Sequence, residues 1–148
     1  MNTQGARQSA DWGLLIIRVG IGAMFIVHGL PKLLGGPPAW AGLGQAMDVF
    51  GVRVFPAFWG FMAAFSECFG GMALILGLFF RTFCFLLAFT MTVAATMHLD
   101  RGHGLLKASH AIELGIVFVG LLFTGPGRFS SRLRLSPKGR GENGKERG

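Results

Sequence analysis

The chain has 148 residues, of which 51% are hydrophobic and only 14% are charged. Charged residues make up about a quarter of a soluble domain, so this balance excludes an ordinary soluble domain and favours a membrane protein. The net charge of +7 does not indicate a nucleic-acid partner, because half of the 14 Lys and Arg residues lie in one stretch after residue 127.

Four apolar runs follow one another along the chain and end at Gly125-Pro126. About 20 helical residues cross a hydrocarbon core of roughly 30 Å. We therefore predict an all-α integral membrane protein, a four-helix transmembrane bundle forming one domain over residues 13–125. Its predicted helices cover about residues 13–34, 56–79, 82–99 and 107–124.

The segment between the first two runs is too polar to span a membrane. Within it Trp40, Leu43, Met47 and Phe50 recur at helical spacing. This pattern predicts a short helix in the membrane interface, with its tryptophan at headgroup depth. An irregular loop fits the same residues, and the pattern alone does not decide between the two.

Residues 126–148 form a basic tail rich in glycine and serine, which predicts disorder because it has little apolar surface to bury. Four spans place both ends of the chain on one side. Arg7, Arg81 and the tail put nine basic residues on that side, against Arg53, Arg101 and Lys107 on the other. This excess predicts cytoplasmic termini, including the N-terminal segment 1–12.

The first predicted helix carries Arg18, His28 and Lys32. At about 100° per residue Lys32 returns to within about 40° of Arg18, and His28 lies on the same side. A charge at the bilayer centre costs roughly 2.5–3.5 kcal/mol on insertion scales. We therefore expect these three side chains to face the interior of the bundle.

The other predicted helices add polar side chains to this interior. Glu67 lies near the midpoint of the second helix and His98 near the end of the third, while His110 and Glu113 are neighbours at i and i+3 on the fourth. The two cations of the first helix and the two carboxylates sum to zero charge. Two interhelical ion pairs are therefore one interpretation of the set.

Three histidines at similar depth, His28, His98 and His110, are not explained by ion pairing. Histidine titrates near neutrality, so it commonly relays protons or binds metals. The spacing of His110 and Glu113 reverses the Glu-x-x-His motif of carboxylate metal sites and occurs once, so we predict no metal site from it.

The polar residues and the glycines around them resemble the DoxX family over about residues 12–125. The resemblance rests on the following residues in chain order: Arg18, His28-Gly29-Leu30-Pro31-Lys32-Leu33, Glu67, Gly70-Gly71, Leu76-Gly77-Leu78, Arg81 and His98. It implies a four-helix bundle in the bacterial cytoplasmic (inner) membrane. It also implies a loose functional label as an oxidoreductase, because the family takes its name from a subunit associated with thiosulfate:quinone oxidoreductase.

The leading hypothesis is therefore a redox-linked membrane subunit that binds a quinone-type ligand between its helices. Ligand-binding residues are expected to be Arg18, Lys32, His110 and Glu113, the last two from their spacing alone. Proton-exchanging residues are expected to be Glu67, His28 and His98. The expected partners are the lipid bilayer and a soluble or membrane redox protein.

Two alternatives belong to different functional classes. One is a non-catalytic anchor or assembly subunit, in which the buried charges set the register of the helices. The other is a metal-handling protein that uses the three histidines with the carboxylates. The residue pattern leaves these alternatives open, along with self-association of the chain.

Overall fold

The computed structural model describes residues 3–130, and the rest of the chain, with most of the predicted disordered tail, lies outside the described residues. Four helices are long and apolar enough to cross a membrane, and no strand occurs between residues 3 and 130. The predicted all-α, four-helix membrane fold is thus confirmed. In chain order the elements are α1 (Thr3–Leu34), α2 (Gly36–Gly44), the 3-10 helix η1 (Gln45–Phe50), α3 (Pro56–Leu76), α4 (Phe80–Asp100) and α5 (Leu105–Thr124).

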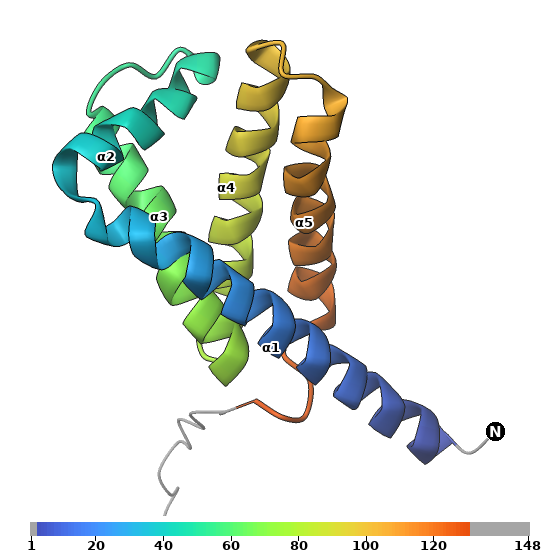
Figure 1. The fold of residues 1–148 in the computed structure, drawn as a ribbon. Helices are drawn as coiled ribbons and strands as arrows, with labels where there is room; N and C mark the ends of the chain where they lie inside the picture. Colours follow the sequence, from blue (N-terminus) through green and yellow to red (C-terminus); the bar gives the residue numbers. More distant parts are fainter. Residues whose placement is uncertain (1–2, 131–148) are drawn as a thin grey trace, which may run out of the picture.

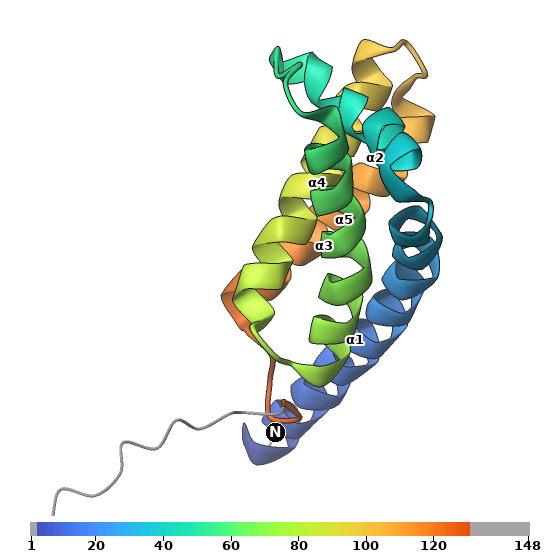
Figure 2. The same cartoon turned by 90° about the vertical axis from the view of Figure 1, so that its left-hand side faces the viewer.

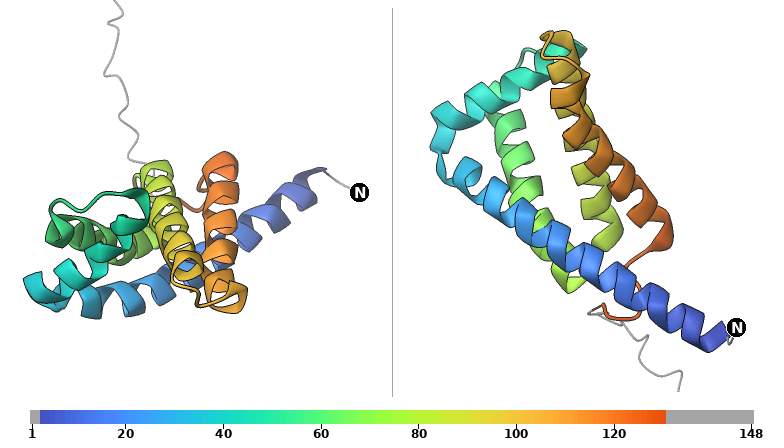
Figure 3. Two further views of the ribbon diagram at one scale, coloured as in Figure 1. Left: turned by 90° about the horizontal axis from the view of Figure 1, so that it is seen from above. Right: turned by 45° about the vertical axis from the view of Figure 1, so that its right-hand side comes forward.

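The long helices form two packed pairs, α1 with α3 and α4 with α5, joined through contacts between α3 and α4 (Figure 1). Among the described residues α1 has no backbone approach to α5 comparable with these. Side chains still connect the two pairs. The rings of Phe25 in α1 and Phe118 in α5 pack edge to face, with their centroids 5.1 Å apart. Figure 3 shows α1 running obliquely across the other helices.

The two ends of the bundle are formed by different elements. The start of α1, the end of α3 and the end of α5 lie at one end, while α2, η1 and the connection between α4 and α5 lie at the other (Figure 2). We call these the terminal end and the loop end. This arrangement follows from four successive spans that cross the bundle in alternating directions.

Helix α1 begins at Thr3, ten residues before the predicted start. Hydrophobic periodicity marks where a helix meets lipid, whereas backbone hydrogen bonding continues as long as no residue breaks it. The polar residues before position 13 contain no proline and thus extend the helix past the apolar run. At the other terminus α1 continues through Pro31 to Leu34.

Helix α3 ends at Leu76, three residues before the predicted end, because of Gly77. This glycine takes a left-handed conformation with φ of 72°, and its amide donates to the carbonyl of Ala73 at 2.8 Å. Glycine adopts that conformation without steric cost, so it commonly terminates helices. The following helix, α4, begins at Phe80.

Glycines bring α1 and α3 into backbone contact. A Cβ atom added at Gly22 would lie 2.6 Å from the carbonyl oxygen of Gly71, and one added at Gly29 would lie 2.5 Å from the amide nitrogen of Cys68. Neither position has room for a side chain. Close approach through small residues is typical of helix packing in lipid, and here it places the end of α1 beside the middle of α3.

The predicted short helix in the first connection is present as α2 and η1, and it begins four residues before Trp40. Gly44 of α2 and Gly60 of α3 contact each other's helix so closely that neither could carry a Cβ atom. The indole nitrogen of Trp40 donates to the carbonyls of Lys32 (3.1 Å) and Leu33 (3.2 Å). These contacts attach the connection to the end of α1 and to the start of α3.

Candidate functional site

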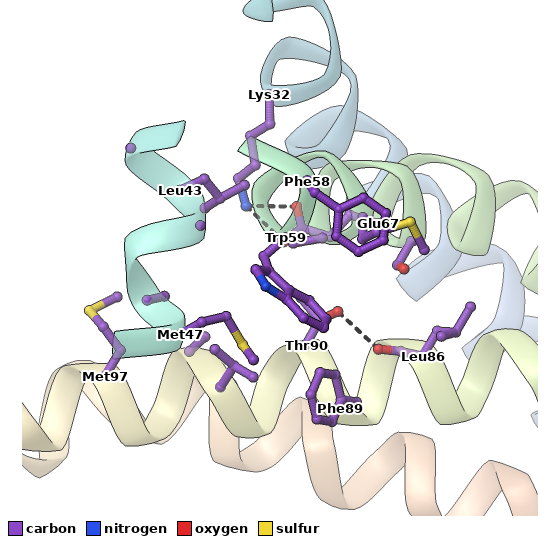
Figure 4. Close-up of a pocket in the computed structure, with 18 of the residues that line it drawn as sticks. Lys32, Leu43, Met47, Phe58, Trp59, Glu67, Leu86, Phe89, Thr90 and Met97 are labelled. Atoms are coloured by element: carbon purple, nitrogen blue, oxygen red, sulfur yellow. Dashed lines mark hydrogen bonds and ion pairs between the residues drawn. The ribbon is translucent and has the colours of Figure 1, made fainter. Parts of the chain in front are cut away.

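The centre of the site is an ion pair between α1 and α3. The ammonium group of Lys32 lies 2.6 Å from Oε2 and 2.8 Å from Oε1 of Glu67 (Figure 4). The side chain of Glu67 is 5% exposed and that of Lys32 is 39% exposed. The carboxylate is therefore enclosed by protein, whereas the Lys32 side chain is partly accessible.

A cavity of about 530 Å³ opens on one side of this pair, between α2, η1, α3 and α4. Its volume falls in the range typical of small-molecule sites. The wall is mostly apolar and includes the aromatic residues Phe58, Trp59 and Phe89 (Figure 4). Such a wall, with one ion pair in it, suits a flat apolar molecule that carries hydrogen-bond acceptors.

Hydroxyl groups add to the polar part of this cavity. Ser66 is buried, precedes Glu67 and lines the cavity, and its hydroxyl has no hydrogen-bond partner among residues 3–130. Thr90 also lines it, but its hydroxyl donates to the carbonyl of Leu86 at 2.9 Å. The Ser66 hydroxyl is therefore available to a ligand.

A second cavity of about 280 Å³ lies on the other side of the ion pair. Lys32 and Glu67 are the residues that line both cavities, so the ion pair forms part of the wall between them. His28 of α1 and His110 of α5 also line the second cavity. The Nδ1 atom of His28 lies 2.8 Å from the carbonyl oxygen of Met24.

The third predicted histidine, His98, belongs to the first cavity and not to the second. Its Nδ1 lies 2.9 Å from Nδ1 of His103, which follows in the connection to α5. One ring must donate and the other accept at that contact. The structure therefore divides the histidines between the two cavities, with His98 at the loop end.

Glu113 is exposed on α5 and lines neither cavity. It takes part in no ion pair within residues 3–130. In the same part of the chain no three His, Cys, Asp or Glu side chains come close enough to hold a metal ion. The described residues therefore give the metal-handling alternative no ligand set.

Arg18 has different partners from those expected. Its side chain is fully buried, and its guanidinium group donates to the carbonyls of Leu74 (2.8 Å) and Ile75 (2.9 Å) at the end of α3. It also donates to the carbonyls of Pro126 (2.6 Å) and Phe129 (3.1 Å) after α5. The ion pair expected for Arg18 is absent from residues 3–130, because backbone carbonyls take up its donors.

The chemistry of helix ends explains this placement of Arg18. The last carbonyls of a helix have no donor within the helix and carry the negative end of its dipole. A guanidinium group offers five N–H donors and can satisfy several carbonyls at once. Arg18 and Lys32 both face α3, but they are about 21 Å apart along α1 at 1.5 Å per residue. Arg18 therefore lines neither cavity.

In the comparison with known proteins, a family model described as DoxX matches residues 13–99. The chain belongs to the DoxX family. No curated protein and no solved structure matches it. The match includes α2, α3, nearly all of α4 and the lipid-spanning part of α1, and thus the ion pair and His98, but it ends before α5. His110 and Glu113, which spacing alone singled out, lie outside the matched region of this DoxX protein.

Several cavity residues of this DoxX protein are missed by sequence reasoning. Ser66 carries a signal, since it is polar, precedes Glu67 and lies in an apolar run. Trp59 and Phe89 carry none, because an aromatic residue in a membrane helix faces lipid as readily as a cavity. Only the packing of α2 and η1 against α3 and α4 makes these rings part of a cavity wall.

Proposed function

We propose that this DoxX-family protein is the quinone-binding subunit of a membrane oxidoreductase. The observation that carries the proposal is the Lys32–Glu67 ion pair, which lies in the wall of an aromatic-lined cavity within a membrane-spanning bundle. An ionic group at that depth is costly unless it is paired or used. Here the Lys32 side chain lines the cavity and is partly exposed, so the pair can be reached by a ligand.

Lys32 would orient the ligand. The ammonium group of Lys32 has three N–H donors. It donates to the two carboxylate oxygens of Glu67, which leaves a donor for a ligand. A quinone carbonyl oxygen can accept a hydrogen bond from the exposed side, with the ring against Trp59 and Phe89. The free hydroxyl of Ser66 supplies a further donor for the polar edge of the ring.

Glu67 would hold and pass protons. Reduction of a quinone to a quinol adds two electrons and two protons, and the reverse reaction releases them. The electrons would come from a redox partner protein, and the protons would pass through Glu67, which is next to the ammonium group and borders both cavities. His28 would exchange protons with it from the second cavity, and His98 from the loop end of the first.

The proposed location is the bacterial cytoplasmic membrane, with both termini in the cytoplasm. The sequence supports this orientation, since it holds nine basic residues in the segments assigned to the side of the termini and three in the connections assigned to the other side. The ligand cavity then opens in the half of the membrane away from the cytoplasm.

The first test is to identify what the protein carries. Full-length protein is purified in detergent, extracted with organic solvent and analysed by mass spectrometry. We expect a quinone at a substantial fraction of one molecule per chain, and less than a tenth of that amount with Lys32→Gln. Equal amounts from both proteins would contradict a site at Lys32.

The second test measures binding to the protein in quinone-free lipid nanodiscs. A short-chain menaquinone or ubiquinone is added while tryptophan fluorescence is recorded. We expect saturable quenching that is lost in Trp59→Phe and kept in Trp12→Phe, because Trp59 lines the cavity and Trp12 does not. Quenching that rises without saturation, or that persists in Trp59→Phe, would indicate partition into lipid and overturn the proposal.

A role as an assembly subunit is the second candidate, and the bonds of Arg18 favour it for the terminal end. One side chain there joins α1 to the end of α3 and to the segment after α5. Such a residue stabilises the bundle without contacting a ligand. The two candidates differ in what the Lys32–Glu67 pair contributes, which is ligand binding in addition to stability in the first and stability alone in the second.

A further inference from the structure

The outward face of α5 carries an ionisable group near the middle of this membrane-spanning helix. Glu113 is the ninth of the twenty residues of α5, about 12 Å from its start at 1.5 Å per residue. It is exposed, and no ion pair or hydrogen bond of residues 3–130 uses its carboxylate. Acidic residues at this depth normally face a protein partner or a water-filled cavity, and Glu113 lines neither cavity.

Glu113 belongs to a continuous stripe along α5. At 100° per residue Leu106, Gly120 and Thr124 lie within about 20° of Glu113, and His110 lies within about 60°. From Leu106 to Thr124 the successive spacings are four, three, seven and four residues. This pattern matches the heptad spacing of residues at the contact between two helices. All five residues are exposed. We call them the α5 seam.

Two features of the α5 seam suit contact with another helix. A Cβ atom added at Gly120 would have nothing within 4 Å, so its small surface faces outward and leaves space for a neighbouring backbone. His110 is exposed one turn before Glu113 and is able to donate a hydrogen bond to a carboxylate. Lipid chains offer no such donor.

We propose that the α5 seam is the interface with a second copy of this chain. In a dimer whose two-fold axis runs along the membrane normal, the two α5 helices are parallel and equal residues lie at equal depth. His110 of each copy is then about 4.5 Å from the depth of Glu113 of the other. Each carboxylate receives a donor from the opposite imidazole, and the contact occurs twice.

Charge complementarity within the α5 seam favours a second copy over another protein. The seam holds one acceptor and one donor at adjacent turns, so it is complementary to itself. The proposal does not depend on ligand binding in the first cavity, because Glu113 is outside that cavity.

The test uses cysteine cross-linking of the full chain in native membranes. Cys68 and Cys84 are buried, so the unmodified chain serves as the blank. Gly120→Cys is compared with Val119→Cys, an exposed neighbour on the same helix that points about 100° away. We expect an oxidant to convert Gly120→Cys to a dimer of twice the 15.9 kDa chain mass, at least tenfold faster than Val119→Cys.

Added substitutions then test the hydrogen bond. Glu113→Leu in the Gly120→Cys background should slow dimer formation at least fivefold, and Glu113→Gln should slow it less because the amide still accepts. Exchange of the two residues, His110→Glu with Glu113→His, should restore the rate. The assignment is overturned if Gly120→Cys and Val119→Cys react equally, or if Glu113→Leu has no effect. A cross-linked product of any other mass would assign the seam to a different membrane protein and overturn the second-copy proposal.

Discussion

The ammonium group of Lys32 lies 2.6 Å from a carboxylate oxygen of Glu67, across the contact between α1 and α3. The pair borders both cavities of the bundle, so it occupies a position where a ligand on one side and a proton route on the other could meet. Its 35-residue separation in sequence is closed by glycine contacts between the two helices.

Exchange of the two charges separates structural from ligand-binding roles. Either neutral single variant, Lys32→Gln or Glu67→Gln, should lower the free energy of unfolding by about 2–3 kcal/mol, less than a fully buried pair would because Lys32 is 39% exposed. The double variant Lys32→Glu with Glu67→Lys restores the ion pair, so it should recover most of that stability. Thermal unfolding in detergent measures both effects.

The same double variant should not recover quinone binding, because the ammonium group would then be on α3 and the carboxylate would face the cavity. Quenching of Trp59 in nanodiscs reports this. Recovery of stability together with full binding would show that the pair is only structural. If the double variant loses both stability and quinone binding, the helices are held by the shape of the contact and not by the pairing of charges.

Removal of the Arg18 guanidinium group should destabilise the bundle. Arg18→Gln removes the guanidinium group that donates four hydrogen bonds to backbone carbonyls. Hydrogen bonds to charged groups contribute roughly 1.5–3 kcal/mol each, and the glutamine amide can replace some of them, so we expect a decrease of about 3 kcal/mol in the free energy of unfolding. The free energy of unfolding of Arg18→Lys should lie between those of the parent chain and Arg18→Gln, because lysine keeps the charge but has fewer N–H donors.

Arg7→Gln is the matched control for Arg18, since Arg7 is exposed on the same helix. Arg7→Gln should have the same melting temperature as the parent chain within experimental error. Ligand binding per folded molecule should be unchanged in all three variants. A selective loss of quinone binding in Arg18→Lys, with normal stability, would contradict the structural role of this residue.

A methyl group at the helix crossing should separate α1 from α3. Gly29→Ala places a Cβ atom 2.5 Å from a backbone nitrogen of α3, so the helices must move apart and the ion pair must lengthen. Overpacking typically costs about 1–3 kcal/mol. Gly20→Ala is the control on the same helix, because nothing lies within 4 Å of its added Cβ atom.

Both glycine variants gain the same helix propensity, so their difference in unfolding midpoint isolates the crossing. We expect Gly29→Ala to unfold at the lower temperature and Gly20→Ala to match or exceed the parent chain. Equal midpoints would mean that the two helices are not in backbone contact at Gly29.

A larger side chain in the wall of the first cavity should block the ligand without disturbing the ion pair. Ala94 lines this cavity from α4, and Ala94→Phe would place a ring in the space. We expect at least a tenfold weaker affinity for short-chain quinone, equivalent to about 1.4 kcal/mol. Thr92→Phe, at an exposed position of α4 outside the cavity, should leave the affinity unchanged.

The hydrophobic pattern of the chain was enough to predict the membrane class, the four spans and their approximate limits. Membrane helices must satisfy their own backbone hydrogen bonds, so long apolar runs translate directly into helices. Helix ends were less predictable, because α1 continues into polar residues and α3 stops at a left-handed glycine. The residues of the motif also indicated which family this chain belongs to.

The contacts of each polar residue, in contrast, depend on how the helices pack. Arg18 and Lys32 share one stripe of α1, yet one meets the carbonyls at helix ends and the other meets Glu67. Glu113 has the same formal charge as Glu67 but faces outward. A periodic pattern gives the side of a helix on which a residue lies, whereas its partner depends on which helices pack together, at what depth and how closely.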